Sequence, residues 1–458
     1  MTDCSVIELS RLPKQLRTVA RIFAEAGFSV YLVGGAVRNL LSEKQPEDYD
    51  LATDAVPEQV MQLFRRVIPT GVQHGTVTVL FQAERFEVTT FRSETTYSDS
   101  RHPDTVEFGV DIETDLSRRD FTINGMALDL RTGLLHDPFG GRQDLADGVI
   151  RAIGDPAERF TEDALRLLRA VRFATQLQFL LADTTRAALT GRSRELSAVS
   201  MERTRDELAK ILRADHPSYG LGLLRDCRLL AAVLPELESC SGNTTPDKGE
   251  LFTHLVRCCD LAPKEPIELR LAALLHQIAP VEVPESGVSA QARSAASAHR
   301  RLKALRFPNA TVSQVAHLIA QMGFEYRPNW DDSDVRRLIS SVGDEYVDAL
   351  LAVARADRMA CSDDLGVQQL DELAGRVSRI RDRNDPLTIR DLAVGGNELA
   401  AAGIPRGPLL GTVLEALLDA VLADPRINQP ERLLPLAQRV YERLADQDEG
   451  HRRGSPRN

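Results

Sequence analysis

The sequence predicts an α+β protein, with an N-terminal head of mixed sheet and helices followed by a long all-α remainder. Three observations lead to this prediction. Short β-branched segments are concentrated before Asp144, apolar residues recur mostly at helical spacing from Phe160 onward, and prolines divide that later part into segments. A chain of 458 residues is long enough for about two to four domains.

The strand signals of the head follow one another along the chain. The segment "SVYLVGG" at 29–35 is apolar and ends in a turn, and "DYDLAT" at 48–53 shows short alternation. Segments 75–82 and 85–94 are β-branched and closely spaced, which predicts an antiparallel pair. A further hairpin is expected across 131–133.

Composition limits the classes of protein to which the chain can belong. With 43% hydrophobic and 27% charged residues it can bury a sizeable core, and we find no run of ~18 apolar residues that predicts a membrane span. The N-terminus lacks a secretory h-region, and the six cysteines form no CxxC pair, so reduced thiols and a cytoplasmic location are expected. The net charge of -11 argues against a nucleic-acid partner. Arginine is dense between 151 and 213, however, so the sequence is still compatible with a local basic cleft.

Two glycines precede two aspartates in "GGAVRNLLSEKQPEDYDLAT" at 34–53. Asp48 and Asp50 have strand spacing, so both carboxylates leave the same face, where a divalent cation would relieve their repulsion. Gly34 and Gly35 let backbone N–H groups approach a phosphate, next to a helix that begins near Ala36. Taken alone, a Gly-Gly pair or an Asp-x-Asp pair more often marks an ordinary glycine turn and an exposed Asx loop, because short motifs have a high false-positive rate.

Four further segments follow in a fixed order: "DLSRRDFTINGMALD" (115–129), "DPFGGRQDL" (137–145), "RAIGDPAERFTEDALRLLRAVRFA" (151–174) and "MERTRDELAKIL" (201–212). With these five motifs the chain resembles the bacterial-type (class II) CCA-adding tRNA nucleotidyltransferases of the polymerase-β-like superfamily. The resemblance implies a nucleotidyltransferase head at 1–145, then an elongated all-α neck (146–215), body (216–365) and tRNA-binding tail (366–445). A disordered end is expected at 446–458.

The resemblance also implies roles for individual residues. It makes Asp48 and Asp50 the catalytic ligands of two Mg²⁺ ions, and Glu87 either a third carboxylate or an exposed strand residue. The chain has Asn39 where the family usually has Asp, which removes a charge. The remaining implied contacts are to phosphate and sugar, by Gly34, Gly35, Arg38, Arg119, Asp120 and Asn124, and to nucleotide or RNA, by Arg169 and Arg172.

Asp163 and Arg166 are implied to read the nucleobase. Their i, i+3 spacing predicts one shared helix face, with a carboxylate acceptor beside guanidinium donors. Cytosine and adenine both show an amine next to a ring acceptor, whereas uracil and guanine show the reverse and would leave buried groups unpaired. The alternative is an ordinary i, i+3 surface ion pair.

The expected activity is template-independent addition of CCA to the 3′ end of tRNA from CTP and ATP. A polar segment at 91–109 matches the loop that the family uses to change from C to A. Alternatives in the same class are a poly(A) polymerase and a CC-only or A-only enzyme. In the tail, a turn around Arg406 opens a helix and either holds an RNA phosphate or simply joins two helices.

The body also partly resembles an HD phosphohydrolase domain. In that frame the metal ligands are His254, His276, Gln277 and Asp357, and Gln277 stands where a working site needs Asp. A degenerate, structural body is therefore expected, with both histidines packed between helices. A phosphohydrolase or a non-catalytic RNA-binding protein are the alternatives of another class, and the oligomeric state is open.

Overall fold

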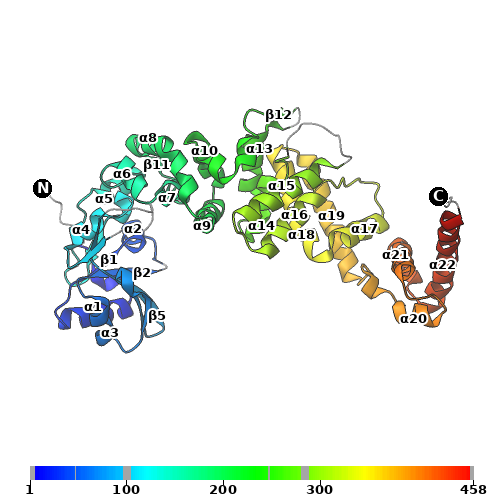
Figure 1. The fold of residues 1–458 in the computed structure, drawn as a ribbon, viewed down its shortest axis with the longest axis horizontal. Coiled ribbons are helices and arrows are strands. Elements are labelled where there is room, and N and C mark those ends of the chain that lie inside the picture. The colour runs from blue at the N-terminus through cyan, green and yellow to red at the C-terminus, as the bar shows by residue number, and fades with distance from the viewer. Residues whose placement is uncertain (1–5, 47, 96–104, 246–247, 280–287, 454–458) are drawn as a thin grey trace. The chain divides into compact units, whose positions relative to one another are not determined.

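The computed structural model describes residues 6–46, 48–95, 105–245, 248–279 and 288–453. Contacts divide the chain into two compact units (Figure 1). The first unit is Met1–Ser239 with Arg301–Phe307, and the second is Cys240–Arg300 with Pro308–Asn458. No helix in the described ranges is both long and apolar enough to span a membrane.

The head is built on a seven-stranded sheet in the order β3-β4-β5-β2-β1-β8-β9. Strands β2 and β5 pair in parallel and the other neighbours are antiparallel, so the predicted mixed sheet is confirmed. Both predicted hairpins are present, as β4–β5 and β8–β9. The strands are β1 Val30–Val33, β2 Tyr49–Thr53, β3 Val67–Gly71, β4 Thr76–Phe81, β5 Glu84–Thr90, β8 Ala127–Asp129 and β9 Leu135–His136.

Helices bury one face of this sheet. Helix α1 (Lys14–Glu25) turns its apolar stripe inward, where Leu16, Val19 and Phe23 are fully buried. The ring of Phe23 lies 5.3 Å from that of Phe64, centroid to centroid. Each such side chain contributes roughly 1.5–3 kcal/mol when it leaves water. The other head helices are α2 Gly35–Leu41, α3 Pro57–Leu63, α4 Ile112–Ser117 and α5 Gly141–Asp147.

The segment predicted as a flexible loop at 91–109 has ordered ends. Strands β6 (Arg92–Thr95) and β7 (Thr105–Phe108) pair antiparallel in a sheet of their own. The middle of the segment, 96–104, lies outside the described residues.

After the head, the first unit is helical except for a short parallel pair, β10 (Val149–Ile150) with β11 (Leu180–Leu181). Helix α7 buries most of one face, and α9 and α10 pack against it. The helices are α6 Pro156–Glu162, α7 Leu165–Leu177, α8 Asp183–Arg192, α9 Met201–Leu212, α10 Pro217–Asp226, α11 Leu230–Val233 and α12 Pro235–Glu238.

The second unit contains helices and one two-residue strand pair among its described residues, β12 (Thr244–Thr245) with β13 (Gly249–Glu250). Helices α13, α14 and α18 pack together. The bounds of the remaining helices are α13 Leu251–Leu261, α14 Ile267–Leu275, α15 Ala290–Ala304, α16 Asn309–Gln321, α17 Asp332–Val342, α18 Asp344–Ala360, α19 Asp364–Asp382, α20 Gly396–Ala401, α21 Pro408–Ala423 and α22 Pro430–Arg453.

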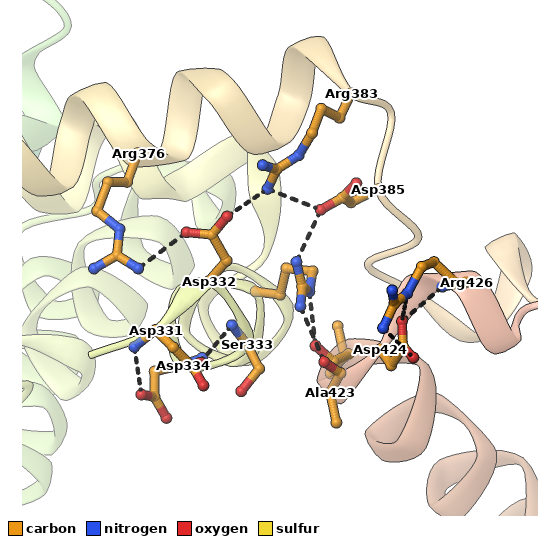
Figure 2. Close-up of polar contacts among 12 residues, drawn as sticks. Asp331, Asp332, Ser333, Asp334, Arg376, Arg383, Asp385, Ala423, Asp424 and Arg426 are labelled. Carbon is orange, nitrogen blue, oxygen red and sulfur yellow. Dashed lines mark hydrogen bonds and ion pairs between the residues drawn. The ribbon is translucent and has the colours of Figure 1, made fainter. Parts of the chain in front are cut away.

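One buried arginine joins the later helices of the second unit. Arg336 in α17 donates to the carbonyl oxygens of Leu422 (2.7 Å) and Ala423 (3.2 Å), the last residues of α21. It also donates to Asp385 after α19, which accepts from Arg383 as well (Figure 2). A cation at the C-terminal carbonyls of a helix satisfies groups that have no partner within the helix.

Two boundaries differ from the expectation. The compact first unit continues beyond 215 to Ser239, because α10 packs closely on α7: a Cβ on Gly220 would lie only 2.3 Å from the Thr175 hydroxyl. At the other end of the chain, α22 continues to Arg453, into the segment predicted to be disordered. Residues 454–458 lie outside the described part.

Candidate active site

A polar cavity of about 390 Å³ lies in the first unit. It collects every residue singled out in the head and neck except Asn39, Asp48, Glu87 and Arg172. Three aspartates and six arginines face it, a charge balance that suits a polyanion. The lining residues are Gly34, Gly35, Arg38, Asp50, Arg118, Arg119, Asp120, Asn124, Asp163, Leu165, Arg166, Arg169, Phe173 and Arg203.

The sheet register gathers carboxylates at one edge of the cavity. Asp50 pairs with Val33 of β1 on one side and with Glu87 of β5 on the other, so Asp50 and Glu87 point to the same face. Burial raises the pKa of Asp50, the charges of Glu87 and Asp48 raise it further, and Arg119 opposes them. Clustered carboxylate oxygens that repel one another are the ligands preferred by a hard divalent cation, so these residues fit such an ion.

Of the two descriptions predicted for Glu87, the exposed strand residue is confirmed, and the third carboxylate beside the metals stays a prediction. It is an exposed strand residue, and its charge is the largest electrostatic contribution that raises the pKa of Asp50. Asp48 is also exposed and lies just before β2.

The glycine turn brings the backbone close to these carboxylates. Gly34 has φ +68°, and a Cβ there would lie 3.5 Å from Arg119 Nη1 and 3.9 Å from Asp50 Oδ2. Other residues rarely adopt this φ, and any side chain would fill the space between the two charged groups. The turn therefore needs glycine for both its conformation and its surroundings.

A chain of hydrogen bonds fixes the polar wall opposite the carboxylates. Arg38 Nη1 donates to Asn124 Oδ1 (2.8 Å), Asn124 Nδ2 donates to Asp120 Oδ1 (3.1 Å), and Arg169 Nε donates to Asp120 Oδ2 (2.7 Å). Burial alone would raise the pKa of Asp120, but Arg169 and Asn124 outweigh it and lower the pKa to about 2. Since both of its oxygens already accept from protein groups, Asp120 orients Asn124 and Arg169.

Two of the lining arginines keep a buried donor without an acceptor. The Nε groups of Arg38 and Arg119 have no hydrogen-bond partner among the described residues. Burial also lowers the pKa of Arg38. An unsatisfied buried donor costs about 1–3 kcal/mol, so this part of the cavity is suited to an anion.

The expected shared helix face of Asp163 and Arg166 is wrong. Asp163 lies at the break between α6 and α7 with extended backbone, φ -145° and ψ 104°. Its Oδ2 accepts from Arg203 Nη2 (2.7 Å), and its Oδ1 accepts from the backbone N–H of Leu165 (3.0 Å). Asp163 therefore lies between the two helices, and α7 begins only at Leu165, so Asp163 and Arg166 do not stand on one continuous helix.

Arg166 is held by other groups on the same side of the cavity. Its guanidinium donates to the Glu162 carboxylate and to the carbonyl oxygens of Arg159 and Arg118, the last two at 3.0 Å each. Asp163 and Arg166 both face the cavity, and no ion pair between them is found in this part of the structure. The alternative of a simple Asp163–Arg166 ion pair is therefore wrong too.

Arg172 is buried away from the cavity. Its Nη1 pairs with Glu207 Oε1 at 2.9 Å, and its guanidinium lies over the Phe173 ring, 4.1 Å from the centroid. Burial lowers the pKa of Arg172 to about 10, against the opposing effect of Glu207. The ion pair with Glu207 of α9 holds this arginine in the interior of the neck. The nucleotide or RNA contact of Arg172 stays a prediction.

The prediction missed four lining residues, Arg118, Leu165, Phe173 and Arg203. Arg118 stands beside Arg119 in "SRRD", and Arg203 lies in the quoted "MERTRDELAKIL" motif. Their motifs were therefore visible, but nothing local distinguishes an arginine that faces a cavity from one that faces water.

A second cluster lies in the second unit. His254, His276 and Asp357 converge as the HD-like spacing implied, and Cys258 joins them. Burial lowers the pKa of His254 and raises that of Cys258. Sequence reasoning missed Cys258, although it stands four residues after His254 and thus on the same helix face. Both histidines are buried, as expected of packed helix residues.

Comparison with known proteins agrees with a cavity that suits a polyanion, because the families that match the chain act on nucleotides or RNA. The family described as "Poly A polymerase head domain" matches residues 30–151, "Probable RNA and SrmB- binding site of polymerase A" matches 178–241, and "tRNA nucleotidyltransferase domain 2 putative" matches 289–437. A CCA-adding enzyme of Enterococcus faecalis is 38% identical over 71% of this chain and 75% of its own length. One from Lactobacillus delbrueckii subsp. bulgaricus is 34% identical over 91% of this chain and 95% of its own length.

The chain belongs to the CCA-adding enzyme family. A solved structure agrees: the CCA-adding enzyme of Bacillus stearothermophilus in complex with CTP superposes with a TM-score of 0.74 at 29% identity, covering 95% of this chain and 98% of that one. Membership of the CCA-adding enzyme family makes the chain a nucleotidyltransferase, and confirms the resemblance drawn from its motifs.

Proposed function

We propose that the chain adds C, C and A in turn to the 3′ end of tRNA, using CTP and ATP without a nucleic-acid template. The observation that carries this proposal is the single cavity in which Asp50, the glycine turn and six arginines meet. The relative from Bacillus stearothermophilus, described in complex with CTP, supports the choice of nucleotide. A cytoplasmic location follows from tRNA as the substrate.

A divalent metal ion is expected for this class of enzyme, and we assign two Mg²⁺ ions to Asp48 and Asp50 with Glu87 beside them. Their oxygen ligands suit Mg²⁺. When bound, the ions make the attacking hydroxyl more acidic and neutralise charge on the leaving phosphate. The positive charge of the ions would also relieve the repulsion that Glu87 and Asp48 exert on the Asp50 carboxylate.

The chain's own groups position the reactants. Arg38, Arg119 and Arg169 hold the triphosphate, and the glycine turn lets it approach the backbone. The terminal ribose hydroxyl of the tRNA then attacks the α-phosphate, a new P–O bond forms, the bond to the β-phosphate breaks and pyrophosphate leaves. Asp120 acts through Arg169 and Asn124, as a positioning residue.

Base selection is assigned to Asp163 and Arg166. Asp163 accepts from the exocyclic amine of cytosine or adenine, and Arg166 donates to the adjacent ring nitrogen and, for cytosine, to O2. Both side chains are already held by the protein, by Arg203 and by Glu162 respectively. A template held in place in this way loses little entropy when the nucleotide binds.

The tail at 366–445 is assigned to the body of the tRNA. Arg406 lies in the turn before α21 and donates to Asn397 Oδ1 (2.9 Å). That contact fits a helix–helix loop as well as an RNA-binding turn, so the tail assignment depends on the family alone.

One experiment tests the activity. A tRNA lacking its last three nucleotides is incubated with CTP and ATP, separately and together, and the products are sequenced. Ordered CCA ends are the expected result. Long A tracts would make the chain a poly(A) polymerase, products ending in CC or in a lone A would make it a partial enzyme, and no extension would favour a non-catalytic RNA-binding protein.

A further inference from the structure

Four potential metal ligands meet in the second unit, apart from the proposed active site. His254 and Cys258 come from α13, His276 follows directly after α14, and Asp357 comes from α18. One ligand atom from each lies within 4.8 Å of all the others. The two histidine side chains are 1% and 2% exposed, and that of Asp357 is 16% exposed.

The contacts converge on one carboxylate oxygen. Asp357 Oδ1 lies 2.8 Å from His254 Nε2, 3.1 Å from His276 Nε2 and 2.7 Å from Lys248 Nζ. A carboxylate oxygen has about two lone-pair positions. Three nitrogens therefore crowd around a single oxygen, which exceeds its two lone-pair positions and places three nitrogen atoms within ligand reach of one point.

The orientation of His276 adds a second argument. Its Nδ1 lies 2.8 Å from the carbonyl oxygen of Ala273. A carbonyl can only accept, so Nδ1 carries a hydrogen, and Nε2 is the ring nitrogen that faces Asp357 Oδ1 at 3.1 Å. Nε2 is therefore the atom of His276 that is placed to bind an ion next to Asp357. A backbone carbonyl that fixes a histidine tautomer in this way is the usual outer contact of a metal-binding histidine.

The spacing of the ligand atoms suits a tetrahedral ion. Bonds of about 2.0–2.3 Å from zinc to N, O and S place neighbouring ligand atoms roughly 3.3–3.7 Å apart. Cys258 Sγ lies 3.3 Å from His254 Nε2 and 3.9 Å from Asp357 Oδ1. Together with the two contacts of Asp357 to histidine, these distances need to change by only about half an ångström to reach that range.

We propose that His254, Cys258, His276 and Asp357 bind one zinc-type divalent cation, as a closed structural site that joins α13, α14 and α18. The ammonium of Lys248 stands in for that cation when the ion is absent. Two imidazoles, one thiolate and one carboxylate favour Zn²⁺ or Co²⁺ over Mg²⁺. With all four positions filled by protein, the ion has no open position for a substrate, so the site stabilises the fold and performs no hydrolysis.

The test uses the full-length chain with Asp48→Ala and Asp50→Ala, so that metal bound at the head does not contribute. The protein is freed of metal with a chelator, reduced, and titrated with Co²⁺. One equivalent should bind, with the intense thiolate-to-cobalt absorption and the visible bands of a tetrahedral ion. Zn²⁺ should displace it, and the melting temperature should rise with Zn²⁺ concentration, because an ion bound only by the folded state stabilises that state.

Two adjacent cysteines provide a matched pair of variants. Cys258→Ser should remove the thiolate absorption and weaken Zn²⁺ binding at least about tenfold, whereas Cys259→Ser, an equally buried neighbour outside the cluster, should change neither. Lys248→Met should bind Zn²⁺ more tightly than the parent, since the competing ammonium is gone. Binding without thiolate absorption, an equal loss in both serine variants, or less than about one-fifth of an equivalent bound would overturn the proposal.

Discussion

The two clusters of charged side chains in this molecule differ in how far the protein satisfies them. In the first unit, a cavity of about 390 Å³ is lined by six arginines, and two of these have a buried Nε donor with no acceptor in the described part of the chain. In the second unit, Asp357 gathers Lys248 and two buried histidines around one oxygen. The first cluster has space and excess positive charge for a polyanion. In the second cluster the ligand atoms lie within 4.8 Å of one another, which leaves space for a single ion at most.

The difference teaches what separates a substrate site from a structural one. Both contain buried ionisable groups with shifted pKa values, so a shifted pKa alone does not identify the catalytic site. Here the proposed assignment of the catalytic site depends on the volume of the cavity and on its donors that have no partner among the described residues. The predictions below are ordered by the size of the expected effect.

Removing the carboxylate of Asp50, on the central strand β2, should have the largest effect. Asp50→Ala should reduce incorporation of both C and A by at least about 10³-fold, because a metal ligand that stabilises charge in the transition state is lost. Binding of tRNA, measured by filter retention, should stay within a few-fold. The control is Glu84→Ala, an exposed acid at the start of β5. Turnover within tenfold of wild type would rule out the assigned role of Asp50.

Base selection should respond next. Asp163→Ala should lower kcat/KM for CTP and ATP by about 10²-fold, and the gap to UTP and GTP should narrow. UTP should gain most in relative terms, because Arg203, freed from Asp163, can donate to the O4 carbonyl. Single-turnover incorporation of each nucleotide on tRNA ending at the discriminator base measures this, with the exposed Glu158→Ala as control. An equal loss for all four nucleotides would make Asp163 a purely structural cap of α7.

Arg172 tests the division between cavity and core. Arg172→Ala leaves Glu207 buried without its main partner and should lower stability by roughly 3 kcal/mol, with base discrimination unchanged. The double variant Arg172→Met, Glu207→Leu should recover most of that loss. Thermal unfolding gives the first quantity and nucleotide incorporation the second. A change in nucleotide selectivity at an unchanged melting temperature would show that Arg172 contacts the nucleotide and does not merely stabilise the core.

The smallest expected effect concerns Asp120 and pH. Its pKa is about 2 in the folded protein, below the ordinary value of about 3.9, so the folded state holds its proton less tightly than the unfolded state. The resulting stability, roughly 2 kcal/mol, is fully present above about pH 4 and is lost as pH falls toward 2. Asp120→Asn should therefore melt lower than wild type at pH 7, and the two melting curves should converge on acidification. A gap that stays constant from pH 7 to pH 2.5 would contradict the assigned ion pair.

The sequence by itself determined what local geometry controls. Strand alternation placed the sheet and both hairpins, and the one-residue gap between Asp48 and Asp50 predicted two neighbouring carboxylates, of which Asp50 lines the cavity. The glycine pair at the start of α2 marked the turn, and φ +68° at Gly34 shows why another residue would be strained there. These features follow from φ/ψ preferences and side-chain periods that act over a few residues.

Only the tertiary structure decided which charged side chains meet. Arg169 and Arg172 stand on the same helix, three residues apart, yet one pairs with Asp120 in the cavity and the other with Glu207 in the core. Asp163 finds Arg203 forty positions later, and His254 finds Asp357 over a hundred positions away. No local pattern contains these pairings, because each depends on packing that brings distant helices together and removes the water that would otherwise keep the charges apart.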